Sequence, residues 1–210
     1  MPTVPMFPLQ VAMLPGEELP LRVFEPRYTA LVQACLATDD PSFGVVLIAA
    51  GREVGGGDTR SDVGALAHIT EYADQGAGRY RLKCAMGERI RVLEWLPDDP
   101  YPRAVVELWP DQPGAPVEVA AIRDIEDRMV ALFERIAAKR GVEVHGRDVV
   151  AGADDSGDAA TWLYALATRL PMGQADRYAV LAAPTVAERI AALSDAVDTV
   201  TAMVEFQLSE

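Results

Sequence analysis

A glycine-rich segment and an acidic segment are the first places in this chain where chemistry could be sought. The glycines from Gly51 to Gly57 have part of a phosphate-binding spacing, but Gly57-Asp58 stand where a P-loop requires Lys followed by Ser or Thr. Arg60 occupies the place of the third glycine in a dinucleotide fingerprint. The segment from Asp154 to Asp158 resembles a calcium-binding EF-hand loop only at its start. We therefore expect a surface loop and a solvated turn, with no bound nucleotide or calcium.

The nucleophiles and bases of the chain are too scattered to predict a hydrolytic site. None of the five serines lies in a G-x-S-x-G or S-x-x-K motif. The two lysines, Lys83 and Lys139, have positions typical of the solvent face of a strand and of a helix C-terminus. His68 and His145 are the only histidines and do not form an i, i+4 ligand pair. We therefore expect a protein that is not an enzyme and that holds no cofactor and no metal.

A run of basic residues in the middle of the chain is the best case for a nucleic-acid surface. We expect a hairpin over residues 79–91, whose charged side chains could contact RNA or another anionic partner. The alternation also has a structural explanation, because Tyr80, Leu82 and Cys84 fall between the charges, as on a half-buried strand. We favour the solvated strand face and keep RNA binding as the alternative hypothesis. The basic residues are Arg79, Arg81, Lys83, Arg89 and Arg91.

The composition argues against several classes of partner. The 210 residues include 32 acidic and 19 basic side chains, which give a formal net charge of −13. Because nucleic-acid affinity comes largely from Lys and Arg displacing counterions, general nucleic-acid binding is disfavoured. No apolar run approaches the ~20 residues that cross a bilayer. A signal peptide begins with a positively charged region, but no basic residue precedes Arg22. Cys35 and Cys84 lie far apart, so we expect a cytoplasmic protein with reduced thiols and no membrane partner.

The first half of the chain has the pattern of a β-rich domain. Its apolar runs and alternating segments are bounded by turn residues such as Gln75-Gly76-Ala77-Gly78. One helix interrupts them, from about Pro26 to Ala37, because proline is tolerated in a first helical turn. We therefore expect a β-rich part with one helix over residues 1–110. Strands are expected over residues 43–48, 63–72, 79–84, 89–95 and 101–109.

After a proline-rich boundary from Pro97 to Pro116, the apolar period becomes that of helices. We expect a helical part over residues 117–210. Thr185 and Glu188 have the capping-box spacing at the start of its last helix. The apolar stripe of its first helix, which Gly141 can end, consists of Ile122, Ile125, Met129, Leu132 and Ile136.

The segment Leu19-Pro20-Leu21-Arg22-Val23-Phe24-Glu25-Pro26-Arg27-Tyr28 is the most specific pattern in the chain. It resembles the N-terminal substrate-binding domain of Lon proteases. The resemblance implies an α+β fold, in which a β-rich PUA-like pseudobarrel is followed by a C-terminal helical bundle, together forming one Lon N-terminal-like domain. Lon proteases continue into an ATPase and a peptidase domain, and because this chain ends at Glu210 without either, we expect a stand-alone, single-domain member. Further agreement lies at residues 43–48, 63–69, 78–80, 87–92, 100–107 and 188–190.

The resemblance implies a non-enzymatic protein- or peptide-binding module. We expect it to engage exposed apolar segments of unfolded or client proteins, with a separate ATPase or protease as a further partner. Because concave sites form preferentially at domain junctions, we expect the binding groove where the β-rich part meets the helices. Adaptable methionine and anchoring aromatic side chains suit such a groove. The candidate peptide-binding residues are Met13, Leu14, Tyr28 and Trp109.

The block from Phe24 to Tyr28 is expected to hold the barrel together. Phe24 and Tyr28 are four residues apart around the start of a helix, where both rings can pack against the sheet. Glu25 complements the helix dipole and Pro26 suits the first helical position. Arg27 offers a planar donor fork for a carboxylate or for carbonyls at the domain junction.

Overall fold

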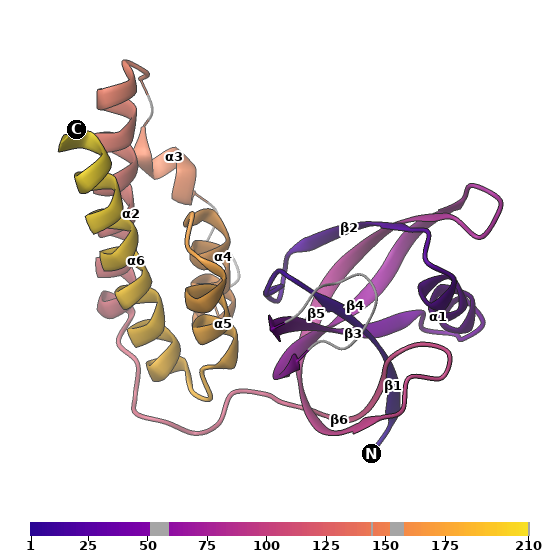
Figure 1. The fold of residues 1–210 in the computed structure, drawn as a ribbon. Coiled ribbons are helices and arrows are strands. Elements are labelled where there is room, and N and C mark those ends of the chain that lie inside the picture. The colour runs from indigo at the N-terminus through magenta and orange to yellow at the C-terminus, as the bar shows by residue number, and fades with distance from the viewer. Residues whose placement is uncertain (51–58, 144, 152–157, 210) are drawn as a thin grey trace. The chain divides into compact units, whose positions relative to one another are not determined.

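The structure, a computed structural model, describes residues 1–50, 59–143, 145–151 and 158–209. The chain divides into two compact units, Met1–Pro110 and Asp111–Glu210 (Figure 1). In the described residues the first unit holds the strands and one helix, and the second holds helices alone. We call them the β unit and the helical unit. The glycine-rich segment 51–57 and the acidic residues Asp154 and Asp155 lie outside the described residues.

The β unit is a mixed sheet that closes on itself. Among the described residues the strand order is β2-β5-β4-β3-β1-β6, and β6 also pairs with β5, which closes a ring and leaves β2 at an edge. The two long strands make closure possible, because β5 pairs with β2 through its first half and with β6 through its second. The strands are β1 (Thr3–Leu9), β2 (Glu18–Val23), β3 (Ser42–Ala50), β4 (Thr59–Asp74), β5 (Tyr80–Leu96) and β6 (Arg103–Leu108).

The expectation of a hairpin over residues 79–91 is wrong. Residues Tyr80–Leu96 form one continuous strand, which pairs with β4 across the turn that precedes it. The sequence suggested a break near Gly87, but the strand runs through this glycine, where a Cβ would lie 2.8 Å from Nε2 at the end of the partly exposed His68 side chain. The turn uses Gly76 and Gly78, whose φ angles of 76° and 73° favour glycine.

Strands β1 and β2 lie outside the strand ranges that the sequence predicts. Proline weakens a strand signal because it cannot donate a backbone hydrogen bond, and β1 contains Pro5 and Pro8 while β2 contains Pro20. Nevertheless β1 lies inside the sheet and is buried on both faces: Met6 belongs to one hydrophobic cluster and Phe7 to another. β2 tolerates its proline because it is an edge strand.

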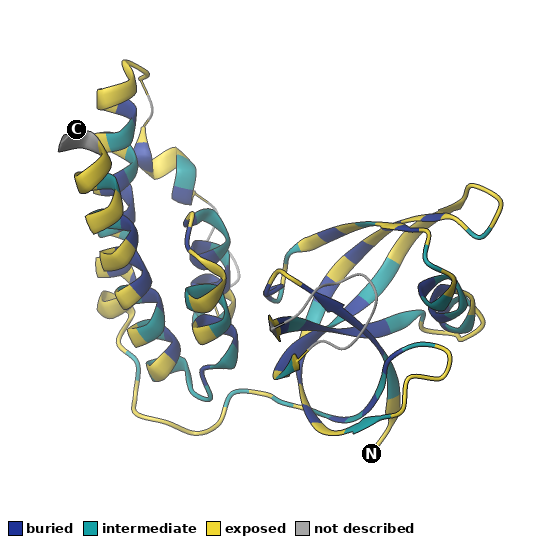
Figure 2. Cartoon of the chain, in the orientation of Figure 1, coloured by how far each residue is buried: buried dark blue, intermediate teal, exposed yellow. Residues whose placement is uncertain are grey.

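Helix α1 (Pro26–Leu36) confirms the helix expected from about residue 26 to residue 37. It buries Tyr28, Leu31, Val32 and Cys35 in the larger hydrophobic cluster of the β unit. Figure 2 shows the buried and exposed residues alternating along the long strands, as a sheet with one covered face requires.

The helical unit confirms the expected helices. Helix α2 (Val119–Arg140) buries Ile122, Ile125, Met129 and Leu132 and is capped by Gly141. The capping box is present at α6, where the backbone N–H of Glu188 donates to Oγ1 of Thr185 over 3.1 Å. The other helices in the described residues are α3 (Gly146–Val150), α4 (Ala159–Arg169), α5 (Gln174–Ala182) and α6 (Val186–Ser209). The α+β fold class, with a helical C-terminal part, is confirmed.

The segment between the two expected parts belongs to the helical unit. The carboxylate of Asp111 accepts hydrogen bonds from both terminal nitrogens of Arg189, one of them 2.9 Å long. The guanidinium of Arg189 is fully buried and lies 4.4 Å from the ring centre of Tyr164. The backbone N–H of Gln112 donates to the carbonyl of Pro184 over 2.9 Å. Arg189 therefore fastens residue 111 to α6, which gives a structural reason for the Glu188-Arg189-Ile190 pattern.

Candidate functional site

Phe24 and Glu25 join β2 to α1. The aromatic rings on either side of Glu25, those of Phe24 and Tyr28, have opposite environments. Tyr28 is buried and stacks on Phe7, with ring centroids 4.0 Å apart. Phe24 is 65% exposed. The expectation that both rings pack against the sheet is therefore right for Tyr28 and wrong for Phe24, because the chain leaves the edge strand before Phe24 and has not yet entered the helix.

Arg27 and Glu25 form a local ion pair above Tyr28. The Nε of Arg27 donates to Oε2 of Glu25 over 3.1 Å, and its guanidinium lies 4.5 Å from the ring centre of Tyr28. Glu25 is the N-cap of α1 but its side chain makes no capping hydrogen bond. The carboxylate that pairs with Arg27 here lies two residues away in the chain, whereas a partner at the domain junction was expected from the sequence. These contacts hold the first turn of the helix against the stacked rings.

A small apolar pocket opens beside Phe24. Its volume is about 120 Å³, close to the ~150 Å³ of a cavity that takes a benzene ring. The pocket is largely apolar, with Arg22 and Glu25 as its charged members, so one apolar side chain of another molecule matches it. The pocket is lined by Phe7, Leu9, Leu21, Arg22, Val23, Phe24, Glu25 and Tyr28.

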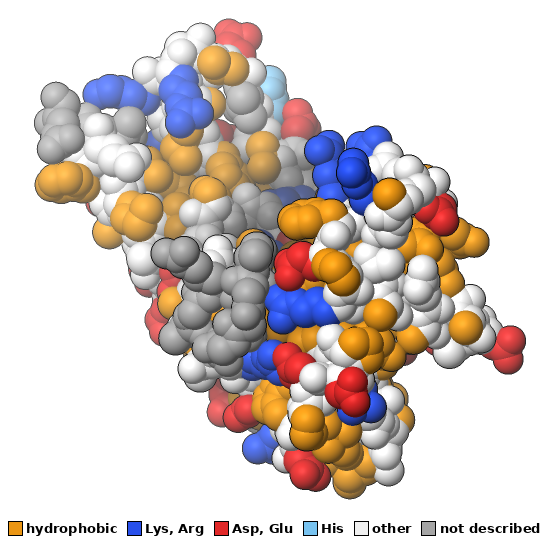
Figure 3. Space-filling view, turned by 45° about the vertical axis from the view of Figure 1, so that its right-hand side comes forward, with side chains coloured by type: hydrophobic (Ala, Val, Ile, Leu, Met, Phe, Trp, Pro, Cys, Tyr) orange, Lys and Arg blue, Asp and Glu red, His pale blue; other side chains and the backbone are white. Residues whose placement is uncertain are grey.

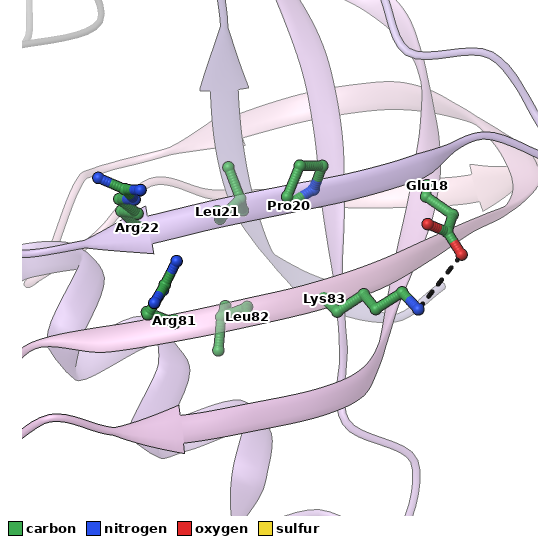
Figure 4. A pocket seen from close by; sticks show the side chains of 7 residues that line it. All are labelled: Glu18, Pro20, Leu21, Arg22, Arg81, Leu82 and Lys83. Carbon is green, nitrogen blue, oxygen red and sulfur yellow. Dashed lines mark ion pairs between the residues drawn. The ribbon is translucent and has the colours of Figure 1, made fainter.

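A larger and more open depression adjoins this pocket on the surface of β2 and β5. It measures about 530 Å³ and shares Leu21 and Arg22 with the apolar pocket (Figure 4). Its other lining residues are Glu18, Pro20, Arg81, Leu82 and Lys83. Hydrophobic and charged side chains lie next to each other over the surface of the β unit (Figure 3). β2, a strand that the sequence did not reveal, thus supplies side chains to both hollows.

The basic residues of β5 do not form one surface. Arg79, Arg81, Lys83 and Arg91 are exposed, whereas Arg89 is 6% exposed. The guanidinium of Arg89 lies 4.5 Å from the ring centre of Trp109, whose backbone N–H donates to the Arg89 carbonyl. Arg89 therefore stabilises the end of the barrel.

Lys83 is already neutralised by its neighbours. Its ammonium lies 3.4 Å from Glu18 and 3.8 Å from Glu71. Arg22, which the sequence-based basic cluster did not include, lies opposite Arg81 in the pairing of β2 with β5. The sequence pattern that could have revealed Arg22 is the alternation of polar and apolar residues from Glu18 to Val23, but Pro20 within it weakened the strand prediction.

The four candidate peptide-binding residues occupy different places in the β unit. Leu14 is fully buried, and its backbone N–H donates to Oε2 of Glu17 over 2.7 Å. Met13 and Tyr28 belong to the larger hydrophobic cluster. Trp109 is half-buried beside Arg89. Of the four, Tyr28 lines the apolar pocket, as part of its wall.

The thiols and imidazoles have structural surroundings. Burial raises the pKa of Cys35 to about 11 and, with the neighbouring Cys35, that of Cys84 to about 12. His68 lies 3.3 Å from Asp40 and 3.5 Å from Glu88 on the surface. Over the described ranges, no group of three or more His, Cys, Asp or Glu side chains is placed to hold a metal ion. None of the described helices has an apolar stretch that could span a membrane.

The fold is that of Lon N-terminal domains. A crystal structure of a Lon N-terminal domain protein from Xanthomonas campestris is 25% identical, with a TM-score of 0.64 over 93% of this chain and 98% of that one. The N-terminal domain of a Mycobacterium avium complex Lon protease shares the fold at 18% identity, with a TM-score of 0.60 over 94% of this chain and 98% of that one.

The sequence itself establishes the family. Residues 3–199 match the profile of the substrate-binding domain of the ATP-dependent protease La (LON), so the chain belongs to this family. The resemblance seen in the sequence is thereby confirmed. A domain of this family binds substrate and is not catalytic by itself. A search of the curated proteins found no match.

Proposed function

We propose that this chain is a non-enzymatic module that binds exposed apolar segments of unfolded or client proteins, and that the apolar pocket beside Phe24 is the contact site. The observation that carries the proposal is the exposure of Phe24, at 65%, next to a pocket of about 120 Å³. Exposed aromatic side chains beside a pocket are frequent anchors at protein interfaces. Family membership supports protein substrates as the partner class.

The proposal includes a separate ATPase or protease as a further partner. Its support is the family's description, which ties the domain to an ATP-dependent protease. The two cysteines are unpaired and buried, as is usual in a reducing compartment, which supports a cytoplasmic site of action.

RNA binding is the weaker candidate for the β unit. Arg89 is buried and Lys83 is paired with two glutamates, so two of the five basic residues on which that hypothesis depended are unavailable to phosphate. The net charge of −13 opposes any polyanion at long range. Apolar recognition has no such opposition.

Peptide titration of the full chain tests the proposal. A short peptide with one central Phe should bind with a Kd on the order of micromolar. Phe24→Ser should weaken binding by about tenfold to hundredfold, because burying one large apolar side chain is worth ~1.5 to 3 kcal/mol. Leu108→Ser is the matched control, since Leu108 is similarly exposed, at 61%, and lies outside the pocket. Equal losses in both variants, or equal affinity for a peptide with Ser in place of Phe, would refute the assignment.

A further inference from the structure

Two arginines face each other across the edge of the sheet without a described counter-charge. Arg22 of β2 is directly opposite Arg81 of β5 in an antiparallel pair, so their side chains leave the same face of the sheet (Figure 4). Both are exposed. Within the described residues neither forms an ion pair. Like charges in directly opposite positions destabilise a strand pair.

The next basic residue on the same face of β5, Lys83, does have acidic partners. Lys83 lies opposite Pro20, and its charge is matched by Glu18 on β2 and Glu71 on β4. The chain carries 32 acidic side chains against 19 basic ones. Although the protein has a surplus of carboxylates, none of the described ones pairs with these two adjacent arginines. A carboxylate from another molecule can therefore bind there.

We propose that the Arg22–Arg81 pair is a carboxylate-binding site, which takes an acidic side chain from an extended segment of a partner protein. A guanidinium presents a planar donor fork that matches a carboxylate in two parallel hydrogen bonds, and two such forks leave the same face of the sheet here. The depression measures about 530 Å³, which gives the segment room. β2 is the edge strand, along which an extended chain can lie.

The surroundings of the two arginines favour a peptide carboxylate over a nucleic-acid backbone. Glu18 and Glu71 flank Lys83 at the other end of the depression, so successive phosphates of a polyanion would meet negative charge. Pro20, which is exposed, and Leu21, which is partly buried, give the depression an apolar part, which suits the side chains of a peptide. Leu21 and Arg22 also line the apolar pocket, so an acidic residue and an apolar residue of one segment can be bound together.

This inference deepens the proposed function by naming the chemistry beside the apolar side chain, but carboxylate binding by the arginines does not require the pocket at Phe24. Three synthetic peptides separate the two ideas. The first carries two Glu residues beside a Phe, the second has Gln in place of Glu, and the third has Ser in place of Phe. Binding to the full chain is followed by fluorescence anisotropy with an uncharged dye.

At low salt the Glu peptide should bind about tenfold more tightly than the Gln peptide, the difference expected of a charge-assisted hydrogen bond. Arg81→Gln should abolish this preference, whereas Lys83→Gln, the matched control on the same strand face, should keep it. The melting temperature of Arg81→Gln should be unchanged or raised, because the substitution removes like-charge repulsion. A residue with a structural role would lower it.

Equal affinity of the wild-type chain for the Glu and Gln peptides would overturn the inference, as would an equal loss of preference in Lys83→Gln. Tighter binding of an RNA oligonucleotide than of the Glu peptide at physiological salt would reassign the site to nucleic acid. A preference for the Glu over the Gln peptide that survives Phe24→Ser, together with binding of the third peptide that Arg81→Gln weakens, supports the carboxylate site even if the proposed function fails.

Discussion

Replacing Arg189 by alanine tests whether the helical unit depends on one buried ion pair. Arg189 is 0% exposed, its two terminal nitrogens donate to Asp111, and its guanidinium lies over Tyr164. Arg189→Ala leaves the carboxylate of Asp111, whose side chain is 24% exposed, without the charge that neutralises it. Removing one partner of a buried pair costs about 3 to 5 kcal/mol, so the free energy of unfolding of the helical unit should fall by that amount.

The matched control is Arg135→Ala. Arg135 forms a 3.0 Å ion pair with Glu205, but the two side chains are 48% and 58% exposed. An exposed pair of this kind contributes about 0 to 1 kcal/mol. Both substitutions remove an arginine whose ion pair involves α6, since Arg189 lies on α6 and Arg135 of α2 pairs with Glu205 of α6. The difference between them therefore measures burial and not the loss of an ion pair as such.

Urea denaturation followed by circular dichroism at the helical wavelength measures both variants. The midpoint for Arg189→Ala should drop well below that of the wild type, while Arg135→Ala should stay close to it. The double variant Arg189→Ala/Asp111→Ala should lose little beyond Arg189→Ala, because the orphaned carboxylate is removed as well. Similar losses for Arg189→Ala and Arg135→Ala would refute the reasoning that burial makes this pair important.

Two further predictions concern ionisation. Hydrogen bonds from the backbone and hydroxyl of Thr161 hold the pKa of Asp158, the N-cap of α4, below its usual range, so Asp158→Ala should cost about 1 kcal/mol. The cost should be full at neutral pH and vanish as the pH falls through the folded pKa; thermal melts that differ equally in acid would contradict this. The thiols of Cys35 and Cys84, with pKa values raised to about 11 and about 12, should resist iodoacetamide in the native protein and react after denaturation. Rapid labelling of the native chain would contradict the burial of these two thiols.

Patterns of residues close together in the sequence were sufficient to predict the longer helices and the family. The apolar stripe of α2, the capping box of Thr185 and Glu188, and proline at the start of α1 each depend on residues a few positions apart, and each appears in the structure. Helical structure is readable in this way because its hydrogen bonds and side-chain contacts connect residues three and four apart.

The candidate site depended on contacts between distant parts of the chain. No local pattern could show that β5 continues through Gly87, or that Arg89 is buried beside Trp109. Phe24 is aromatic like Tyr28 and lies four residues before it, yet it is exposed because the chain turns away from the sheet there.

The sequence by itself determined the helices apart from the short α3, the alternation along the long strands and membership of the Lon substrate-binding family. Only the tertiary structure decided that β2, despite its proline, is the edge of the sheet and that Arg22 lies opposite Arg81. The physical reason is that strand pairing joins residues far apart in the sequence, and its register is set by the burial of one face and by bulges, which are properties of the whole sheet.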